Sequence, residues 1–191
     1  MSTMVQTGYF KTPEEYLEAE RVSEEKHEYL AGVIYAMAGT SADHDRIVLN
    51  ICRELGIQLR GKKCEVFSSN LKVQIRKGGA HFFYYPDVIV DCSGVAGNSF
   101  FANEPRVIFE VSFPKTERID REEKRLNYQS LSSLQVYVLV EQSRLAVTVY
   151  RRENADWALE LLTNKQDNLQ LPEVESALPM TAIYERTHLV R

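Results

Sequence analysis

Two acidic residues stand in apolar segments where a carboxylate is unfavourable. Asp87 precedes the apolar run 88–90, and Glu110 has apolar residues on both sides, with Val111 following it. An ionised carboxylate in such surroundings is costly unless it is paired or holds a metal. Two hypotheses fit this pattern. Either the two acids share a divalent cation, or Asp87 caps a turn after Pro86 while Glu110 pairs with a buried Arg or Lys.

The spacing of the acids favours close contact between them. If the strands around them fold back symmetrically, the turn falls at residues 98–99, inside a loop, and Asp87 and Glu110 become near cross-strand neighbours on one face. Like charges at that distance repel, and a divalent cation between them relieves the repulsion. A hairpin centred on residues 78–79 likewise puts Asn70 opposite Asp87, as a neutral neighbour of a metal site or simply as a turn residue.

A predicted helix over residues 118–131 brings further polar side chains to one face. Asp120, Lys124 and Tyr128 are spaced i, i+4, i+8. A face that begins polar and ends apolar suits a helix whose first turns face a site, whereas the alternative is an ordinary surface Asp–Lys pair. His44, on the apolar face of another predicted helix, is either a ligand or a half-buried structural histidine. Glu28 is either functional or an ordinary surface acid.

The elements that must position these residues are helices and strands in mixed order. A helix begins at residue 13 with Thr12 as its N-cap and Glu15 in the capping box, and a second spans residues 41–60. A hairpin over residues 27–38 turns at Ala31-Gly32. Strands are expected over residues 65–76, 82–91, 106–113, 135–141, 145–152 and 157–163. This order predicts an α/β (α+β) fold in one domain, 1–191, with a central mixed sheet flanked by helices.

Composition limits the possible functions. The chain has 191 residues and a formal net charge of −4, which gives no electrostatic argument for a nucleic-acid coat protein or a membrane-surface binder. Its three cysteines are too scattered for a disulfide framework or a zinc site, and their odd number predicts reduced thiols. No apolar run could span a bilayer and no signal peptide is recognisable, so we expect a cytoplasmic protein. GxSxG, GxxxxGK[ST], GxGxxG and HExxH motifs do not occur.

Four segments together resemble the Uma2 family (DUF820), over about residues 24–157. They are KHEYLAGVIYAMAGTSADH, VFSSNLKVQI, YPDVIV and VIFEVSFPKTERIDREEKRLNYQSLSSLQVYVLVEQ, in this order. Members of the family are usually described as "putative restriction endonucleases" of the PD-(D/E)XK nuclease superfamily. The resemblance implies a PD-(D/E)XK nuclease-like core, in which acids on two adjacent strands hold Mg²⁺ and a lysine positions or activates the attacking water.

The resemblance assigns roles to individual residues. Asp87 and Glu110 match the two acids, and the backbone carbonyl near Val111 would help them hold the metal. The usual lysine two residues after the second acid is missing, because Ser112 stands there, and Lys124 on the following helix takes its place. The remaining matched positions are Glu28, His44, Asp120 and Tyr128. The chain departs from the family at Ala31 and Asn70, where aspartate is frequent, and over residues 112–116.

The implied activity is Mg²⁺-dependent hydrolysis of DNA phosphodiester bonds, with Mn²⁺ as a possible substitute. Lys124 would orient the water or stabilise the developing charge. Six basic residues near the site are candidates for contact with the DNA backbone: Lys72, Arg76, Lys115, Arg118, Arg121 and Arg125.

We also expect a homodimer, since two symmetric sites would cut both strands. Two alternatives remain open. One is a binding or interaction protein of a defence or mobile-element system that keeps the nuclease fold without turnover. The other is a metal-dependent hydrolase that acts on a substrate other than DNA.

Overall fold

The computed structural model describes residues 10–37, 39–112 and 118–190, without the side chains of 118–121. The helices in these ranges are α1 (Pro13–Glu20), α2 (Ala42–Gln58), α3 (Arg118–Gln129) and α4 (Met180–Ile183), with a 3-10 turn at Pro172–Val174. None of the described helices is long and apolar enough to cross a membrane. The strands are β1 (His27–Leu30), β2 (Val33–Ala36), β3 (Glu65–Ser68), β4 (Lys72–Lys77), β5 (Ala80–Tyr84), β6 (Val88–Asp91), β7 (Phe101–Ala102), β8 (Pro105–Ser112), β9 (Val136–Glu141), β10 (Val147–Glu153), β11 (Asp156–Leu162), β12 (Asn168–Leu171) and β13 (Ser176–Pro179).

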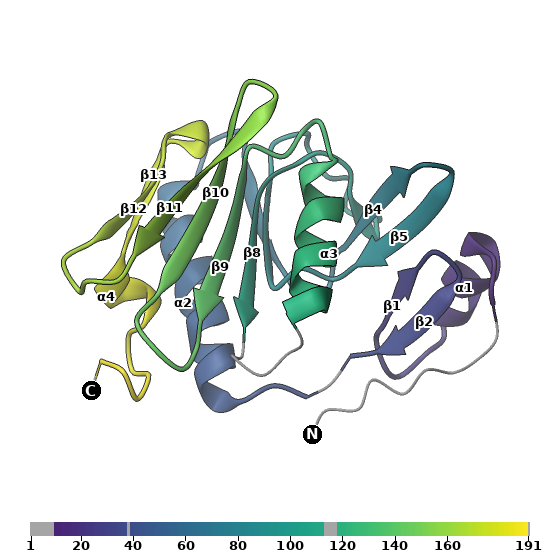
Figure 1. Cartoon of the computed structure of the whole chain (residues 1–191), viewed down its shortest axis with the longest axis horizontal. Coiled ribbons are helices and arrows are strands. Elements are labelled where there is room, and N and C mark those ends of the chain that lie inside the picture. Colours follow the sequence, from purple (N-terminus) through teal and green to yellow (C-terminus); the bar gives the residue numbers. More distant parts are fainter. Residues whose placement is uncertain (1–9, 38, 113–117, 191) are drawn as a thin grey trace.

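Two mixed sheets make up most of this α+β fold. The six-stranded sheet has the order β11-β10-β9-β8-β6-β3 and is antiparallel except for the β8–β9 pair. The five-stranded sheet has the order β2-β1-β5-β4-β7, and only β4 and β7 are parallel. Figure 1 shows α2 behind the six-stranded sheet and α3 in front of it, between this sheet and the β4–β5 hairpin.

Each face of the six-stranded sheet therefore has its own core. On the α2 side, Ile47, Ile51 and Leu55 pack against the sheet and against the small β12–β13 hairpin. On the α3 side, Tyr128 packs against residues of both sheets. β8 lies between β6 and β9, and this central position agrees with its nearly continuous apolar sequence.

The predicted starts and turns of the N-terminal half are confirmed. Thr12 and Glu15 form the capping box of α1. The β1–β2 hairpin turns at Ala31 and Gly32, whose φ angles of 49° and 105° are those of a tight turn with two left-handed residues. The N-cap of α2 is Ser41, one of two candidates that the sequence offers, with Thr40.

Two of the predicted strands are wrong in one respect, because each is divided in two. Residues 65–76 form β3 and β4, and residues 82–91 form β5 and β6. β3 pairs with β6 in the six-stranded sheet, whereas β4 pairs with β5 in the five-stranded sheet. Pro86, which has no N–H for a ladder, lies where the chain leaves β5 for β6. Asp87 thus stands at the passage from one sheet to the other.

The prediction of three reduced thiols is also wrong. Cys64 and Cys92 form a disulfide, and only Cys52 is free. The reason is the β3–β6 register, in which Glu65 lies opposite Asp91, so the residues just beyond them are brought face to face. Their separation of 28 residues in the sequence conceals this proximity.

The C-terminal segment contains elements that the sequence did not predict. The β12–β13 hairpin and α4 cover the α2 side of the six-stranded sheet. The Tyr184 hydroxyl lies 2.9 Å from the backbone oxygens of both Glu141 and Ala146, which fastens this segment to the loop between β9 and β10.

Candidate active site

The two predicted acids are cross-strand neighbours. In the antiparallel β6–β8 pair, Val88 lies opposite Phe109, and the same register carried one residue further places Asp87 opposite Glu110. The predicted adjacency on one face is therefore confirmed. Oδ2 of Asp87 accepts a hydrogen bond of 2.7 Å from the backbone N–H of Val111, so this carboxylate is tied across to β8 and does not cap a turn of its own segment.

Lys124 on α3 contacts acids of two other elements. Its Nζ lies 3.1 Å from Oε1 of Glu110 on β8 and 2.7 Å from Oε1 of Glu28 on β1. The three side chains are each about one-fifth exposed or less. The lysine partner that the second hypothesis expected for Glu110 is thus Lys124 itself. The ion pairs bind α3 to both sheets.

Two further predicted residues contact the acids. Tyr128, one turn after Lys124 on α3, donates a hydrogen bond of 3.0 Å to Oε1 of Glu110. His44, in the first turn of α2, has its Nε2 3.3 Å from Oδ2 of Asp87 and is 9% exposed. The site therefore lies where α2, α3 and the two sheets meet.

The electrostatics of the site follow from burial and from the number of acids. Burial raises the pKa of Glu110 to about 7, and the charges of Asp87 and Glu28 act in the same direction, against the lowering effect of Lys124. Burial by itself lowers the pKa of Lys124, but the charges of Glu110 and Glu28 outweigh it and hold this pKa well above its ordinary value. Burial also opposes protonation of His44, yet the hydrogen bond and charge of Asp87 raise its pKa.

The donor atoms at this site suit a hard cation. Within the described residues, no cluster of three or more His, Cys, Asp and Glu side chains has metal-site geometry. Asp87 Oδ1 and Glu110 Oε2 are nevertheless carboxylate oxygens without a hydrogen-bond partner among those residues. Mg²⁺ is commonly held by one or two carboxylates, with water completing its octahedron. Asp87 and Glu110 repel each other, and a bound cation would relieve this repulsion.

Some predicted residues are not brought to the site. Asn70 is an exposed turn residue whose Oδ1 accepts a hydrogen bond from Lys26, so its placement beside Asp87 is wrong. The β4–β5 ladder ends at Val73 and Tyr84, before this position is reached. The side chain of Asp120 lies outside the described residues.

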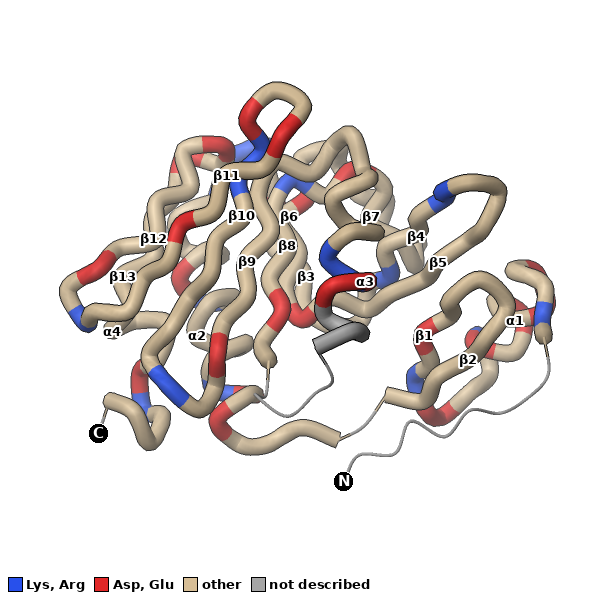
Figure 2. Tube along the Cα trace, viewed as in Figure 1, with Lys and Arg blue, Asp and Glu red and all other residues tan. Residues whose placement is uncertain are grey.

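The six basic residues proposed to contact the DNA backbone lie in different surroundings. The prediction is wrong for Lys72, because it is 7% exposed, donates to the Tyr85 hydroxyl and lies over the rings of Phe100 and Phe101. Arg125 stacks on Tyr150 with its guanidinium 4.8 Å from the ring centre. Arg76 is exposed, whereas the side chains of Lys115, Arg118 and Arg121 lie outside the described residues. Figure 2 shows Lys and Arg scattered over many elements of the described chain, interspersed with acids.

Sequence reasoning missed the residues that hold Glu28 in place. Oε1 of Glu28 accepts a hydrogen bond of 3.2 Å from the backbone N–H of Tyr85. The hydroxyl of Tyr85 in turn donates to Oε1 of Glu20 and accepts from Lys72. In the sequence, only the position of Tyr85 two residues before Asp87 could have indicated a role at the site. Glu28, Glu20 and Lys72, which Tyr85 contacts, come from distant segments.

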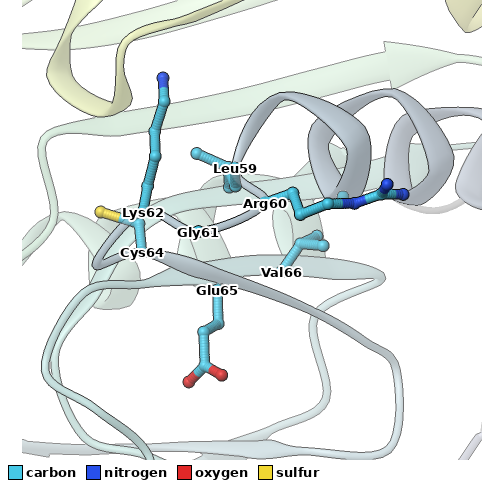
Figure 3. A pocket seen from close by; sticks show the side chains of 8 residues that line it. Leu59, Arg60, Gly61, Lys62, Cys64, Glu65 and Val66 are labelled. Carbon is cyan, nitrogen blue, oxygen red and sulfur yellow. The ribbon is translucent and has the colours of Figure 1, made fainter.

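Two hollows in the surface of the described residues lie away from the acids. One, of about 240 Å³, lies between the end of α2 and the start of β3. Figure 3 shows that Arg60, Lys62 and Glu65 extend from it in different directions, so their charges do not converge on a ligand. A second hollow, of about 450 Å³, is lined by residues of the start of α2 and by His188. Neither is lined by Asp87, Glu110 or Lys124.

Comparison with known proteins gives this geometry a family. The model of the Uma2 family, described as "Putative restriction endonuclease", matches residues 13–182, a longer span than the resemblance in sequence suggested. Two Synechocystis proteins are similar in sequence. The protein slr1290 is 35% identical over 177 residues, covering 91% of this chain and 90% of its own length. The protein sll1609 is 30% identical over 171 residues, covering 87% of this chain and 96% of its own length.

A solved structure shares the fold. The crystal structure of a "putative nuclease belonging to DUF820" from Anabaena variabilis matches with a TM-score of 0.73, covering 90% of this chain and 96% of that one, at 18% identity. The match of the family model over most of the chain, together with the identity to slr1290, shows that the chain belongs to the Uma2 (DUF820) family.

Proposed function

We propose that this protein is a Mg²⁺-dependent endonuclease that hydrolyses DNA phosphodiester bonds on a PD-(D/E)XK nuclease-like core. The observation that carries the proposal is the placement of Asp87 opposite Glu110, with Lys124 within 3.1 Å of Glu110. Two acids on adjacent strands and a nearby ammonium are what metal-assisted attack on a phosphodiester requires. The family description as a restriction endonuclease agrees with this activity.

Asp87 and Glu110 are the metal-holding residues of the proposal, with the carbonyl of Val111 as a third donor. Mg²⁺, or Mn²⁺ in its place, would lower the pKa of a bound water and neutralise negative charge at the phosphate. Both the Val111 N–H and His44 contact Oδ2 of Asp87, so this carboxylate is held in place before a metal binds. Its other oxygen, Oδ1, is the one proposed to bind the metal.

Lys124 is the proposed electrostatic group. The charges of Glu110 and Glu28 hold its pKa well above the ordinary value, so it is protonated at neutral pH. A charged ammonium beside the metal-holding acids stabilises negative charge as it develops on the phosphate oxygens, or orients the attacking water. Glu28 also holds this ammonium, at 2.7 Å, and the Tyr128 hydroxyl donates a hydrogen bond to the Glu110 carboxylate.

The test is cleavage of supercoiled plasmid DNA with Mg²⁺ or Mn²⁺, followed by gel analysis of nicked and linear products. We expect cleavage by the unaltered protein, and none by Asp87→Ala or in the presence of EDTA. An exposed acid on α3, Glu122, supplies a matched control, since Glu122→Ala should cleave normally. If purified protein binds DNA or a protein partner but cleaves nothing, and Asp87→Ala binds equally well, the protein is a binding module. Cleavage of RNA or another phosphodiester in place of DNA would correct the substrate.

A further inference from the structure

An apolar area lies on the α3 side of the six-stranded sheet, toward its β11 edge. Leu159 and Leu161 on β11 are 62% and 57% exposed. The partly buried side chains of Leu139, Tyr150 and Trp157 lie on the same face of β9, β10 and β11. We call these five residues the β11 patch. In Figure 1, α3 lies beside β8 and leaves β11 uncovered on this side. Arg125 of α3 extends to Tyr150 on β10.

The edge of the sheet beside this patch is also open. β11 is the last strand of the sheet, seven residues long, and its register with β10 runs without interruption. In the described chain, residues 156–162 make no backbone hydrogen bond outside that ladder. Natural edge strands are commonly protected by charged side chains, above all lysine, or by proline, a bulge or a covering loop. The sequence DWALELL contains no lysine, arginine or proline, and its charged residues are the two acids Asp156 and Glu160.

We propose that β11 pairs with β11 of a second copy of this chain, antiparallel about a two-fold axis at Leu159, and joins two six-stranded sheets into one. A two-fold axis perpendicular to the sheet keeps the two β11 patches on the same side. It also gives both strands partners for their unpaired backbone groups. The partner is a second copy of this chain, because the apolar side chains of β11 lie opposite one another when the strand pairs with itself.

The side chains select this register among the alternatives. With Leu159 opposite Leu159 of the partner subunit, Trp157 lies opposite the partner's Leu161, and Glu160 lies opposite the partner's Ala158. Moving the axis to Glu160 would place two like charges directly opposite each other, which is destabilising. Moving it to Ala158 would remove the leucine–leucine pair and leave Leu161 opposite an alanine. A shift of the pairing by a single residue would turn the apolar face of one copy away from that of the other.

The first test is the mass of the protein in solution, by light scattering at tens of micromolar. We expect twice the 22.0 kDa of one chain for the unaltered protein. Leu159→Lys should raise the dissociation constant of the dimer by about 100-fold or more, since it places two ammonium groups at the centre of the interface. Leu49→Lys is the matched control, because Leu49 is 59% exposed on α2, away from the patch, and its replacement should leave the dimer intact.

The second test reads the register directly. Opposite residues of antiparallel strands have their Cα atoms about 5 Å apart, so Leu159→Cys should form an intersubunit disulfide on oxidation. Leu161→Cys should not, because the two copies of residue 161 would be about 13 Å apart along the strands. A monomer for the unaltered protein, a dimer that survives Leu159→Lys, or crosslinking by Leu161→Cys without Leu159→Cys would each overturn the proposal.

Discussion

Lys124 offers the most informative single substitution in the proposed active site. Its ammonium is 2.7 Å from Glu28 and 3.1 Å from Glu110, and it also lies 5.3 Å from the centre of the Tyr84 ring. Lys124→Met keeps most of the side-chain volume against this ring and removes only the charge. Lys124→Arg keeps the charge but changes its shape and reach.

The expected loss of activity follows from the two carboxylates whose charge the Lys124 ammonium neutralises. Without the ammonium, Glu110 and Glu28 lose their common counter-ion, and the pKa of Glu110 rises above the value of about 7 that it already has. At neutral pH the carboxylate is then protonated and competes poorly for a cation. Loss of a preorganised charge at the reacting phosphate costs about 2–4 kcal/mol of barrier, or about 30- to 1,000-fold in rate. A surface pair would instead contribute well under 1 kcal/mol to stability and nothing to rate.

The assay compares kcat and KM for plasmid nicking by the unaltered protein, Lys124→Met, Lys124→Arg and the control Glu122→Ala. We expect kcat to fall for Lys124→Met, with a smaller loss for Lys124→Arg and none for Glu122→Ala. Circular dichroism and melting temperature verify that each variant is folded. If folded Lys124→Met cleaves within about twofold of the unaltered rate, the electrostatic role of Lys124 is refuted.

Three further predictions concern the metal, the pH and the disulfide. Mg²⁺ or Mn²⁺ should raise the melting temperature of the unaltered protein, by the equivalent of about 2.7 kcal/mol at 100 times the dissociation constant. Glu110→Gln should abolish this response, and an equal response would remove Glu110 from the metal site. Because the pKa of Glu110 is raised from 4.5 to about 7 in the fold, its contribution to stability is present below pH 4.5 and is lost as the pH rises through 7. Urea denaturation in EDTA should show the unaltered protein losing up to about 3 kcal/mol relative to Glu110→Gln over that range, and parallel curves would contradict the shift. Reduction of the Cys64–Cys92 disulfide, which closes a loop of 28 residues, should cost about 3–4 kcal/mol of stability, seen as a lower melting temperature. The same reducing agent should not change the melting temperature of Cys64→Ser, which lacks the disulfide.

The contacts of the site that could be predicted are those set by the pairing within a hairpin or by the repeat of a helix. A hairpin fixes which residues face each other once its turn is located, and this was sufficient to place Asp87 opposite Glu110. The helical repeat likewise placed Lys124 and Tyr128 on one face of α3, and both reach Glu110.

The parts that could not be predicted depend on which sheet a strand joins. Asn70 lies in the turn between β3 and β4, where the chain changes ladder partners, and Lys72 is the first residue of β4. The alternation of apolar residues is the same in both sheets. One side chain is consequently buried against aromatic rings, and the other is exposed in a turn. The Cys64–Cys92 contact follows from the β3–β6 register, which the undivided strands of the sequence analysis could not supply.

The bridge formed by Lys124 also has a consequence for the order in which the protein matures. Glu28 and Lys124 are separated by 96 residues, so their contact closes one of the longer loops in the chain and forms only after many local contacts. During synthesis the three acids leave the ribosome before the lysine that balances them. A growing chain that ends before α3 therefore carries clustered acids without their ammonium partner. The proposed cleavage activity would therefore require α3 to be in place against both sheets.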